Sequence, residues 1–273
     1  MGHYDSELQR QCDEGQQLLM ATEYLRAERV LCDAAKKAEA SGDYDTLGRV
    51  YYPLQEARRQ RRQVCGEGTI KLDLLPCGAH DVPDPATVAE RYPHGQVLLA
   101  GWASVEPARE LRRIADERGL YLETYLAAAY PTAEGVTMVA LLPHAEEDLP
   151  DENVCVDGGL EALLEGLPSD SVVLRADDLP HGASPGSAET FAKTMELWEN
   201  LSLPLLNAAR ALEKPKQRIA GYKKAIEADY ACEKAHQWLA TDALLVARDN
   251  RSASDDAGSD RSPVSPDAEA TAP

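Results

Sequence analysis

The chain has 273 residues, 44% of them hydrophobic, and its 47 acidic against 28 basic residues give a formal net charge of −19. That length suits about two domains, and the apolar content is enough for a sizeable core. A field this negative repels phosphates, which disfavours nucleic acids and anionic membrane surfaces as partners.

No apolar run approaches the ~18 residues that cross a bilayer, and no apolar segment at the start indicates a secretory signal. The six cysteines are widely spaced and form no CxxC pair. This pattern is more typical of free thiols in a reducing compartment than of disulfides. We therefore expect a cytoplasmic protein. No motif indicates a cofactor, and none is expected.

The chain begins with a series of expected helices. Residues 5–25 are polar with scattered leucines, and a helical apolar period continues over 24–40. Gly42 then ends that helix, and Asp43 caps the next one. Pro53 lies inside this next helix and lacks a backbone donor, so we expect a kink or restart there. Its apolar face is formed by Tyr44, Leu47, Tyr51 and Leu54.

A dense basic cluster ends this first helical block and stands out in so acidic a chain. One interpretation is a site for a phosphate, a nucleic acid or an acidic peptide. The other is a helix C-terminus whose dipole favours cations, with the arginines paired to the many carboxylates of the protein. The cluster consists of Arg58, Arg59, Arg61 and Arg62.

The periodicity changes after Gly68, and residues 69–200 predict one mixed α/β domain. Compact or alternating apolar runs predict strands, and capped runs between them predict helices. Residues 120–130 and 135–142 favour an antiparallel hairpin, although the first of these runs also suits a helix. The expected strands are 69–75, 97–100, 120–130, 135–142, 154–156 and 171–175, and the expected helices are 86–92, 105–118, 160–165 and 187–198.

Histidines follow prolines in three loops of this domain, each beside an expected strand: His94, His144 and His181. If the strand ends converge, these histidines form a metal site, with Asp177 or Asp178 adding a carboxylate. No HxH or HExxH spacing is present, so exposed turn residues are the commoner interpretation. The sequence assigns no catalytic residue.

The last ordered block, 201–249, is again helical. Helices are expected over 201–212, 216–229 and 231–248. From Asn250 the chain is rich in Ser, Asp, Ala and Pro without an apolar run, which predicts a disordered acidic tail over 250–273.

Two segments, about 28–61 and 199–247, resemble a tetratricopeptide repeat, a helical hairpin that stacks into protein-binding arrays. The residues that carry the resemblance are Ala34, Ala35, Ala38, Gly42, Asp43, Tyr44 and Tyr51 in the first segment, and Tyr222 and Ala225 in the second. Leu47, Leu54 and Tyr230 depart from the family pattern, and a generic α-hairpin is the alternative. The resemblance implies an interaction scaffold.

We therefore predict an α+β protein with tetratricopeptide-like hairpins at both termini (1–66 and 201–249) around a central mixed α/β domain (69–200). The favoured function is an adaptor that binds a protein or peptide, with the basic cluster and Trp238 as candidate contacts. The alternative is an enzyme, metal-dependent in one version, with its site in the central domain and the helices as a docking or dimerisation platform. The two helical ends either pack together, which makes the middle an insertion, or stand apart.

Overall fold

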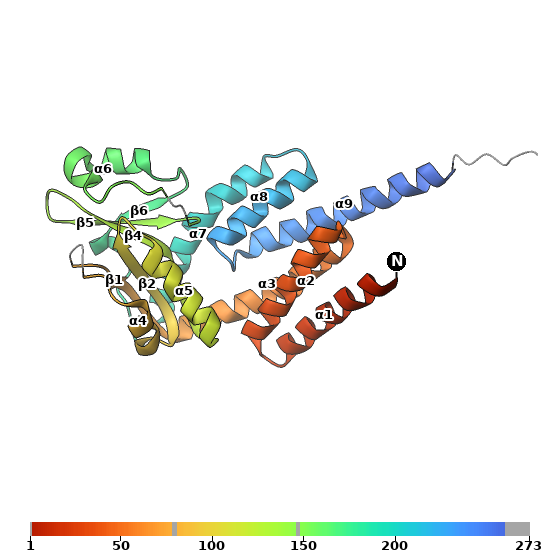
Figure 1. The fold of residues 1–273 in the computed structure, drawn as a ribbon, viewed down its shortest axis with the longest axis horizontal. Coiled ribbons are helices and arrows are strands. Elements are labelled where there is room, and N and C mark those ends of the chain that lie inside the picture. The colour runs from red at the N-terminus through yellow and green to blue at the C-terminus, as the bar shows by residue number, and fades with distance from the viewer. Residues whose placement is uncertain (1, 78–80, 146–147, 260–273) are drawn as a thin grey trace, which may run out of the picture.

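The computed structural model describes residues 2–77, 81–145 and 148–259. Figure 1 shows a sheet covered by helices at one end of the molecule and a group of longer helices at the other. The longer helices come from both termini, and the sheet comes from the middle of the chain. The expected α+β class, with helical segments at both ends of a mixed α/β region, is confirmed.

The N-terminal helices are α1 (Gly2–Met20), α2 (Tyr24–Ser41) and α3 (Tyr44–Glu67). Gly42 adopts the expected left-handed conformation (φ 72°) after α2. The Asp43 side chain caps α3 by accepting a hydrogen bond from the Thr46 amide at 3.0 Å. The expected restart at Pro53 is wrong, because α3 continues through this residue as one helix. α3 packs against α2 and α9 on either side of Pro53, and this packing offsets the one missing donor.

The C-terminal helices are α7 (Ala188–Arg210), α8 (Pro215–Ala228) and α9 (Glu233–Ser259). α7 is one helix with Pro204 inside it, whereas the sequence predicts two helices separated near residue 200. α9 continues past Asn250 to Ser259, into the segment predicted as a disordered tail. Residues 260–273 of that tail lie outside the described part. No helix in the described ranges has an apolar stretch that would span a bilayer.

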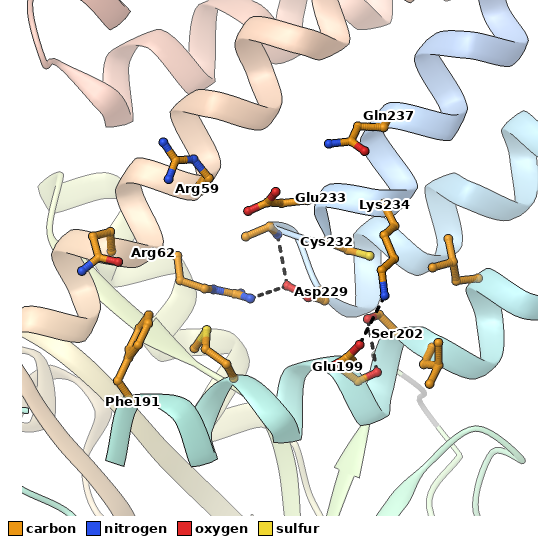
Figure 2. Close-up of a pocket in the computed structure, with 15 residues that line it drawn as sticks. Arg59, Arg62, Phe191, Glu199, Ser202, Asp229, Cys232, Glu233, Lys234 and Gln237 are labelled. Carbon is orange, nitrogen blue, oxygen red and sulfur yellow. Dashed lines mark hydrogen bonds and ion pairs between the residues drawn. The ribbon is translucent and has the colours of Figure 1, made fainter. Parts of the chain in front are cut away.

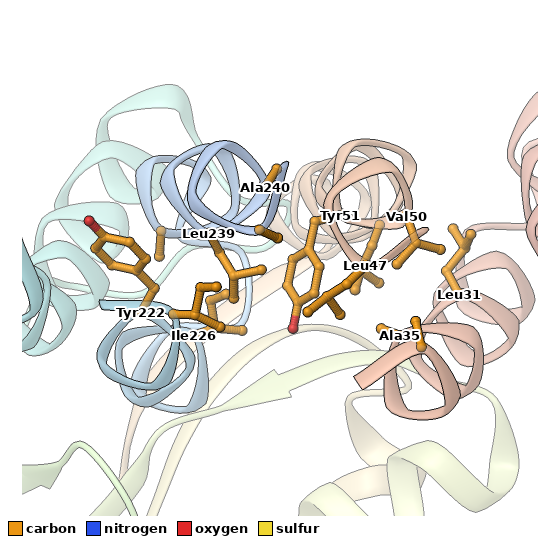
Figure 3. Close-up of a cluster of buried hydrophobic side chains, with 14 of the residues drawn as sticks. Leu31, Ala35, Leu47, Val50, Tyr51, Tyr222, Ile226, Leu239 and Ala240 are labelled. Atoms are coloured by element: carbon orange, nitrogen blue, oxygen red, sulfur yellow. The ribbon is translucent and has the colours of Figure 1, made fainter. Parts of the chain in front are cut away.

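The two ends of the chain pack against each other through α3 and α9, which run antiparallel. Arg62 near the end of α3 contacts Asp229 just before α9, and Asp45 at the start of α3 pairs with Arg251 at 3.3 Å. Figure 3 shows one layer of apolar side chains continuing from α2 through α3 and α9 to α8. We call α1, α2, α3, α7, α8 and α9 together the helical array. Its shared core includes Leu31, Ala35, Leu47, Tyr51, Tyr222, Ile226 and Leu239.

Gly48 lies at a close approach of α3 to α9. A Cβ at this position would be 2.7 Å from Leu244 Cγ and 2.9 Å from the carbonyl oxygen of Ala240. A valine therefore forces the helices apart, and we expect Gly48→Val to lower the free energy of unfolding by about 1–3 kcal/mol in urea titrations. Ala40→Val on the exposed face of α2 is the control, with a cost below ~0.7 kcal/mol from helix propensity. Equal losses in the two variants would contradict this close packing.

The central sheet is mixed, as the sequence predicts. Its strand order is β1-β2-β4-β5-β6, and β3 pairs with β2 beside β4. The pairs that β2 forms with β1, β3 and β4 are parallel, whereas β4–β5 and β5–β6 are antiparallel. The expected hairpin is confirmed in β4 and β5, but the expected first strand over 120–130 is divided at Tyr125 into β3, which pairs with β2, and β4. The strands are β1 (Thr69–Leu74), β2 (His94–Trp102), β3 (Tyr121–Thr124), β4 (Leu126–Pro131), β5 (Thr137–Leu142) and β6 (Val172–Arg175).

Helices cover both faces of this sheet. One face packs under α4 (Pro85–Arg91), α5 (Glu106–Arg118) and α6 (Val154–Gly166). A short 3-10 turn, η1 (Ala176–Asp178), follows β6. The other face packs under α7, where the Trp198 ring stacks on Tyr125 with centroids 4.0 Å apart. Because the C-terminal half of α7 lies in the helical array, this helix joins the array to the sheet.

The segment 154–156 is the start of α6, and the prediction of a short strand there is wrong. The Asp151 side chain accepts from the Asn153 amide at 2.9 Å, and this turn leads directly into helical hydrogen bonds. Three apolar residues are too few to determine a strand against such a turn. Gly159, with φ 71°, kinks α6 where the sequence predicts the helix to begin.

The central domain enters and leaves the helical array at one place. The Gly186 amide donates to the Gly68 carbonyl at 2.6 Å, and the hydroxyls of Thr69 and Ser184 are 3.0 Å apart. Residues 69–185 therefore form an insertion in the helical array, and the two ends of this insertion lie side by side. Of the two arrangements that the sequence left open, the structure has the one in which the helical ends pack together.

Candidate functional site

The basic cluster at the end of α3 lies largely between the helical array and the sheet. The side chains of Arg58, Arg61 and Arg62 are 13%, 21% and 7% exposed, whereas that of Arg59 is 48% exposed. The buried arginines meet polar groups from distant parts of the chain, and we call this group the junction cluster. Its members are Glu28, Arg58, Arg61, Arg62, Glu123, Asp229 and His236.

Glu28 of α2 holds two arginines of α3. Arg58 Nε donates to one carboxylate oxygen at 2.9 Å, and Arg61 Nη1 donates to the other at 2.8 Å. Burial alone would raise the pKa of Glu28, but Arg61 and Arg58 outweigh it and keep the pKa below its usual value. Glu28 is therefore charged at neutral pH, and its two ion pairs link α2 to α3.

His236 of α9 is fully buried against the same arginine. Its Nε2 lies 3.1 Å from Arg58 Nη1, and its Nδ1 lies 2.8 Å from the carbonyl oxygen of Cys232. Because a guanidinium only donates, Nε2 must accept and Nδ1 must carry the proton. Burial and the neighbouring Arg58 charge lower the pKa of His236 to about 3, so the ring is neutral.

Arg62 connects the array to the sheet. Its Nη1 donates to Asp229 at 2.6 Å, and its Nε is 3.4 Å from a carboxylate oxygen of Glu123 on β3. The guanidinium carbon lies 4.6 Å from the centre of the Trp198 ring and 4.7 Å from that of Tyr230. Burial disfavours this charge, but Asp229 and Glu123 outweigh burial and raise the pKa of Arg62.

A groove of about 500 Å³ opens beside the junction cluster, between α3, α7 and α9. Figure 2 shows Arg59 and Arg62 of α3, Glu233 of α9 and Phe191 of α7 around one space. We call it the α3–α7–α9 groove. Since α3 and α9 come from opposite ends of the sequence, the groove exists only when the array is closed. The apolar side chains that α7 contributes to it are Phe191, Met195, Leu203 and Leu206.

Charged side chains surround this apolar lining. Arg59 pairs with Glu56 at 2.7 Å, and Lys234 Nζ is 3.6 Å from Glu199. Glu233 forms no ion pair with another described residue. Leu203 is 37% exposed. The groove thus offers an exposed leucine and a carboxylate outside the described ion pairs, although this carboxylate, after Glu56, helps to raise the pKa of Arg59.

The other predicted site residues lie elsewhere. Trp238 packs in the array, with its ring centre 6.0 Å from that of Tyr222 and the Arg210 guanidinium 4.3 Å above it. His94, His144 and His181 are exposed. Among the described residues, no group of three or more His, Cys, Asp or Glu side chains is arranged to hold a metal ion.

Sequence reasoning missed several residues of the junction and the groove. Glu123 had a signal, because it interrupts an apolar strand at a position that faces the core. Asp229 and His236 had none, since each pairs with an arginine more than 160 positions away. Leu203 and Glu233 resemble ordinary surface residues in the sequence.

Three comparisons with known proteins give no relative from which a function can be transferred. No protein-family model matches the chain, no curated protein matches its sequence, and no solved structure matches its fold.

Proposed function

We propose that this protein is an interaction scaffold that binds a peptide segment of a partner protein in the α3–α7–α9 groove. The observation that carries the proposal is the groove, which combines an apolar lining on α7 with charged side chains from both ends of the chain. Protein interfaces use the same combination of an apolar centre and a polar rim. The alternative of an enzyme in the central domain stays a prediction.

We also infer that α2–α3 and α8–α9 are tetratricopeptide-like hairpins. In support, Ala34, Ala38 and Ala225 are fully buried at the small-residue positions. Tyr51 and Tyr222 lie in the same core at the aromatic positions. A single hairpin cannot bury its apolar face, and stacking the two hairpins between α1 and α7 meets that requirement.

The partner segment that fits this groove is apolar and basic. An apolar side chain would pack on Leu203 and Phe191, and a lysine or arginine beside it would pair with Glu233. The net charge of −19 adds a long-range attraction for a basic segment. Arg59 at the rim excludes a run of basic residues next to α3, so a single basic residue is expected.

The test is a selection from a displayed library of random peptides against the immobilised full chain, followed by fluorescence-polarisation titration of the enriched peptides. We expect peptides with a bulky apolar residue next to lysine or arginine. Leu203→Glu should weaken their binding about tenfold or more, because the apolar side chain of the peptide would then pack against the new carboxylate. Glu233→Gln should weaken it severalfold and reduce its salt dependence.

Leu212→Glu is the matched control, since Leu212 is 40% exposed and does not line the groove. The Leu212→Glu variant should bind the enriched peptides as tightly as the unchanged protein does. Peptides that bind all of these variants equally well would show that they bind another surface, and failure to enrich any peptide would also count against the proposal.

A further inference from the structure

A second cavity, of about 260 Å³, lies at the junction of the helical array and the sheet, and it shares no lining residue with the groove. It lies along β3, which among the described strands pairs with β2 alone. Leu122, Glu123 and Thr124 of this strand form one wall. Side chains from α2, α3, α5, α7 and α8 and from the turn after α8 close the remainder: Glu28, Arg61, Arg112, Asp116, Trp198, Glu227, Ala228 and Tyr230.

Buried polar groups in this wall lack partners within the protein. Glu123 is 4% exposed and forms an ion pair with Arg62 Nε at 3.4 Å, but neither of its carboxylate oxygens accepts a hydrogen bond. Arg61 Nε and the Tyr230 hydroxyl are also buried without a partner. A buried polar atom without a hydrogen bond costs roughly 1–3 kcal/mol, more when it is charged. Several such atoms around one cavity are what a polar ligand would satisfy.

Arg112 of α5 adds a second cation to the wall, and the charge of Glu123 acts on it. Its Nε donates to the carbonyl oxygen of Thr124 at 2.9 Å, and it forms no ion pair with another described residue. Burial lowers the pKa of Arg112 to about 10, so the group stays charged at neutral pH. The guanidiniums of Arg58, Arg61, Arg62 and Arg112 face the carboxylates of Glu28, Glu123 and Asp229. Among these buried groups one positive charge is in excess, although the exposed carboxylates of Asp116 and Glu227 also line the cavity.

We propose that this cavity binds a small oxyanion that also carries a proton donor, either a hydrogen phosphate group or a hydroxycarboxylate. Arg112 neutralises the anionic oxygens, and Arg61 Nε and the Tyr230 hydroxyl donate to them. Glu123 accepts the hydrogen bond from the hydroxyl of the ligand. This arrangement places negative charge beside Arg112 and gives Arg61 Nε, the Tyr230 hydroxyl and one Glu123 oxygen a partner. Asp116 and Glu227 lie at the exposed rim, where water solvates them.

Isothermal titration calorimetry of the full chain tests this site with inorganic phosphate, glycolate and acetate, each at a constant ionic strength set with sodium chloride. Saturable binding of phosphate or glycolate is expected, and whichever binds more tightly identifies the ligand class. Acetate has no donor for Glu123 and should bind at least about tenfold more weakly than glycolate. Absence of saturable binding of both phosphate and glycolate overturns the proposal.

Arg112→Gln should weaken binding of the better probe by about tenfold or more. The matched control is Arg113→Gln on the next position of α5, because Arg113 is exposed and pairs with Glu110 and Glu117. It should leave binding within about twofold. Equal effects of the two substitutions overturn the site. Glu123→Met provides a second reading if Arg112→Gln does not fold, since methionine removes the acceptor and should abolish the preference for glycolate over acetate. A preference that persists in Glu123→Met also overturns the proposal.

Discussion

Arg62→Met is expected to lower the free energy of unfolding by about 3–5 kcal/mol, the cost of breaking a buried ion pair by removing one partner. The methionine fills much of the space between Trp198 and Tyr230, so the loss is mainly electrostatic. Asp229 then keeps a single hydrogen-bond donor, the Ala231 amide at 3.1 Å. Glu123 also loses its nearest cation. Chemical denaturation monitored by circular dichroism measures the difference.

Arg59→Met is the control for this prediction. It lies three positions earlier in the same helix but is exposed, and its ion pair with Glu56 is a surface pair worth ~1 kcal/mol or less. The double variant Arg62→Met with Asp229→Asn should recover part of the loss, because the second change removes the uncompensated charge. If Arg62→Met costs no more than Arg59→Met, the buried pair contributes little to stability.

Acid should destabilise the protein through His236, and His236→Gln should remove that effect. The folded-state pKa of about 3 lies below the ordinary value near 6.5. Above pH 6.5 the ring is neutral in both states and contributes no pH dependence. Below pH 6.5 the unfolded chain binds a proton that the folded chain does not, so stability falls as the pH falls. The loss is about 1.4 kcal/mol per pH unit, or about 3 kcal/mol at pH 4.5.

Urea unfolding at pH 7.5, 6.0 and 4.5 tests this prediction. The drop in stability over this range should be about 3 kcal/mol smaller in His236→Gln than in the unchanged protein, because every other titrating group is common to both. His181→Gln is the control, since His181 is exposed. If stability depends on pH in the same way in all three proteins, the His236 imidazole has the same pKa in the folded and the unfolded chain, and the prediction is wrong.

The burial of the basic cluster could have been inferred from its spacing. Arg58, Arg61 and Arg62 follow Leu54 at four, seven and eight positions and continue the apolar face of α3, whereas Arg59 falls beside it. Helical periodicity therefore separates the buried arginines from the exposed one. The density of positive charge alone does not make this distinction.

Most of the elements were also predictable, because capping residues and apolar periods are local. The strands of the hairpin and the caps Gly42 and Asp43 follow directly from the sequence. The groove and the second cavity were not predictable. Both depend on the N-terminal helices meeting the C-terminal ones, and that contact joins residues such as Arg62 and Asp229, which are 167 positions apart. No local pattern encodes such a pairing.

The insertion of the central domain between the halves of the array has a consequence for synthesis on the ribosome. When α3 emerges, the face that will meet α9 has no partner, and it must wait for the 167 residues that separate Arg62 from Asp229. At ~5–20 residues per second this delay is about 8–30 s. During it, Glu28 can already pair with Arg58 and Arg61, because all three lie in the N-terminal half, and one net positive charge remains. The charged end of α3 therefore keeps an unfinished interface hydrated and protects the nascent chain from aggregation.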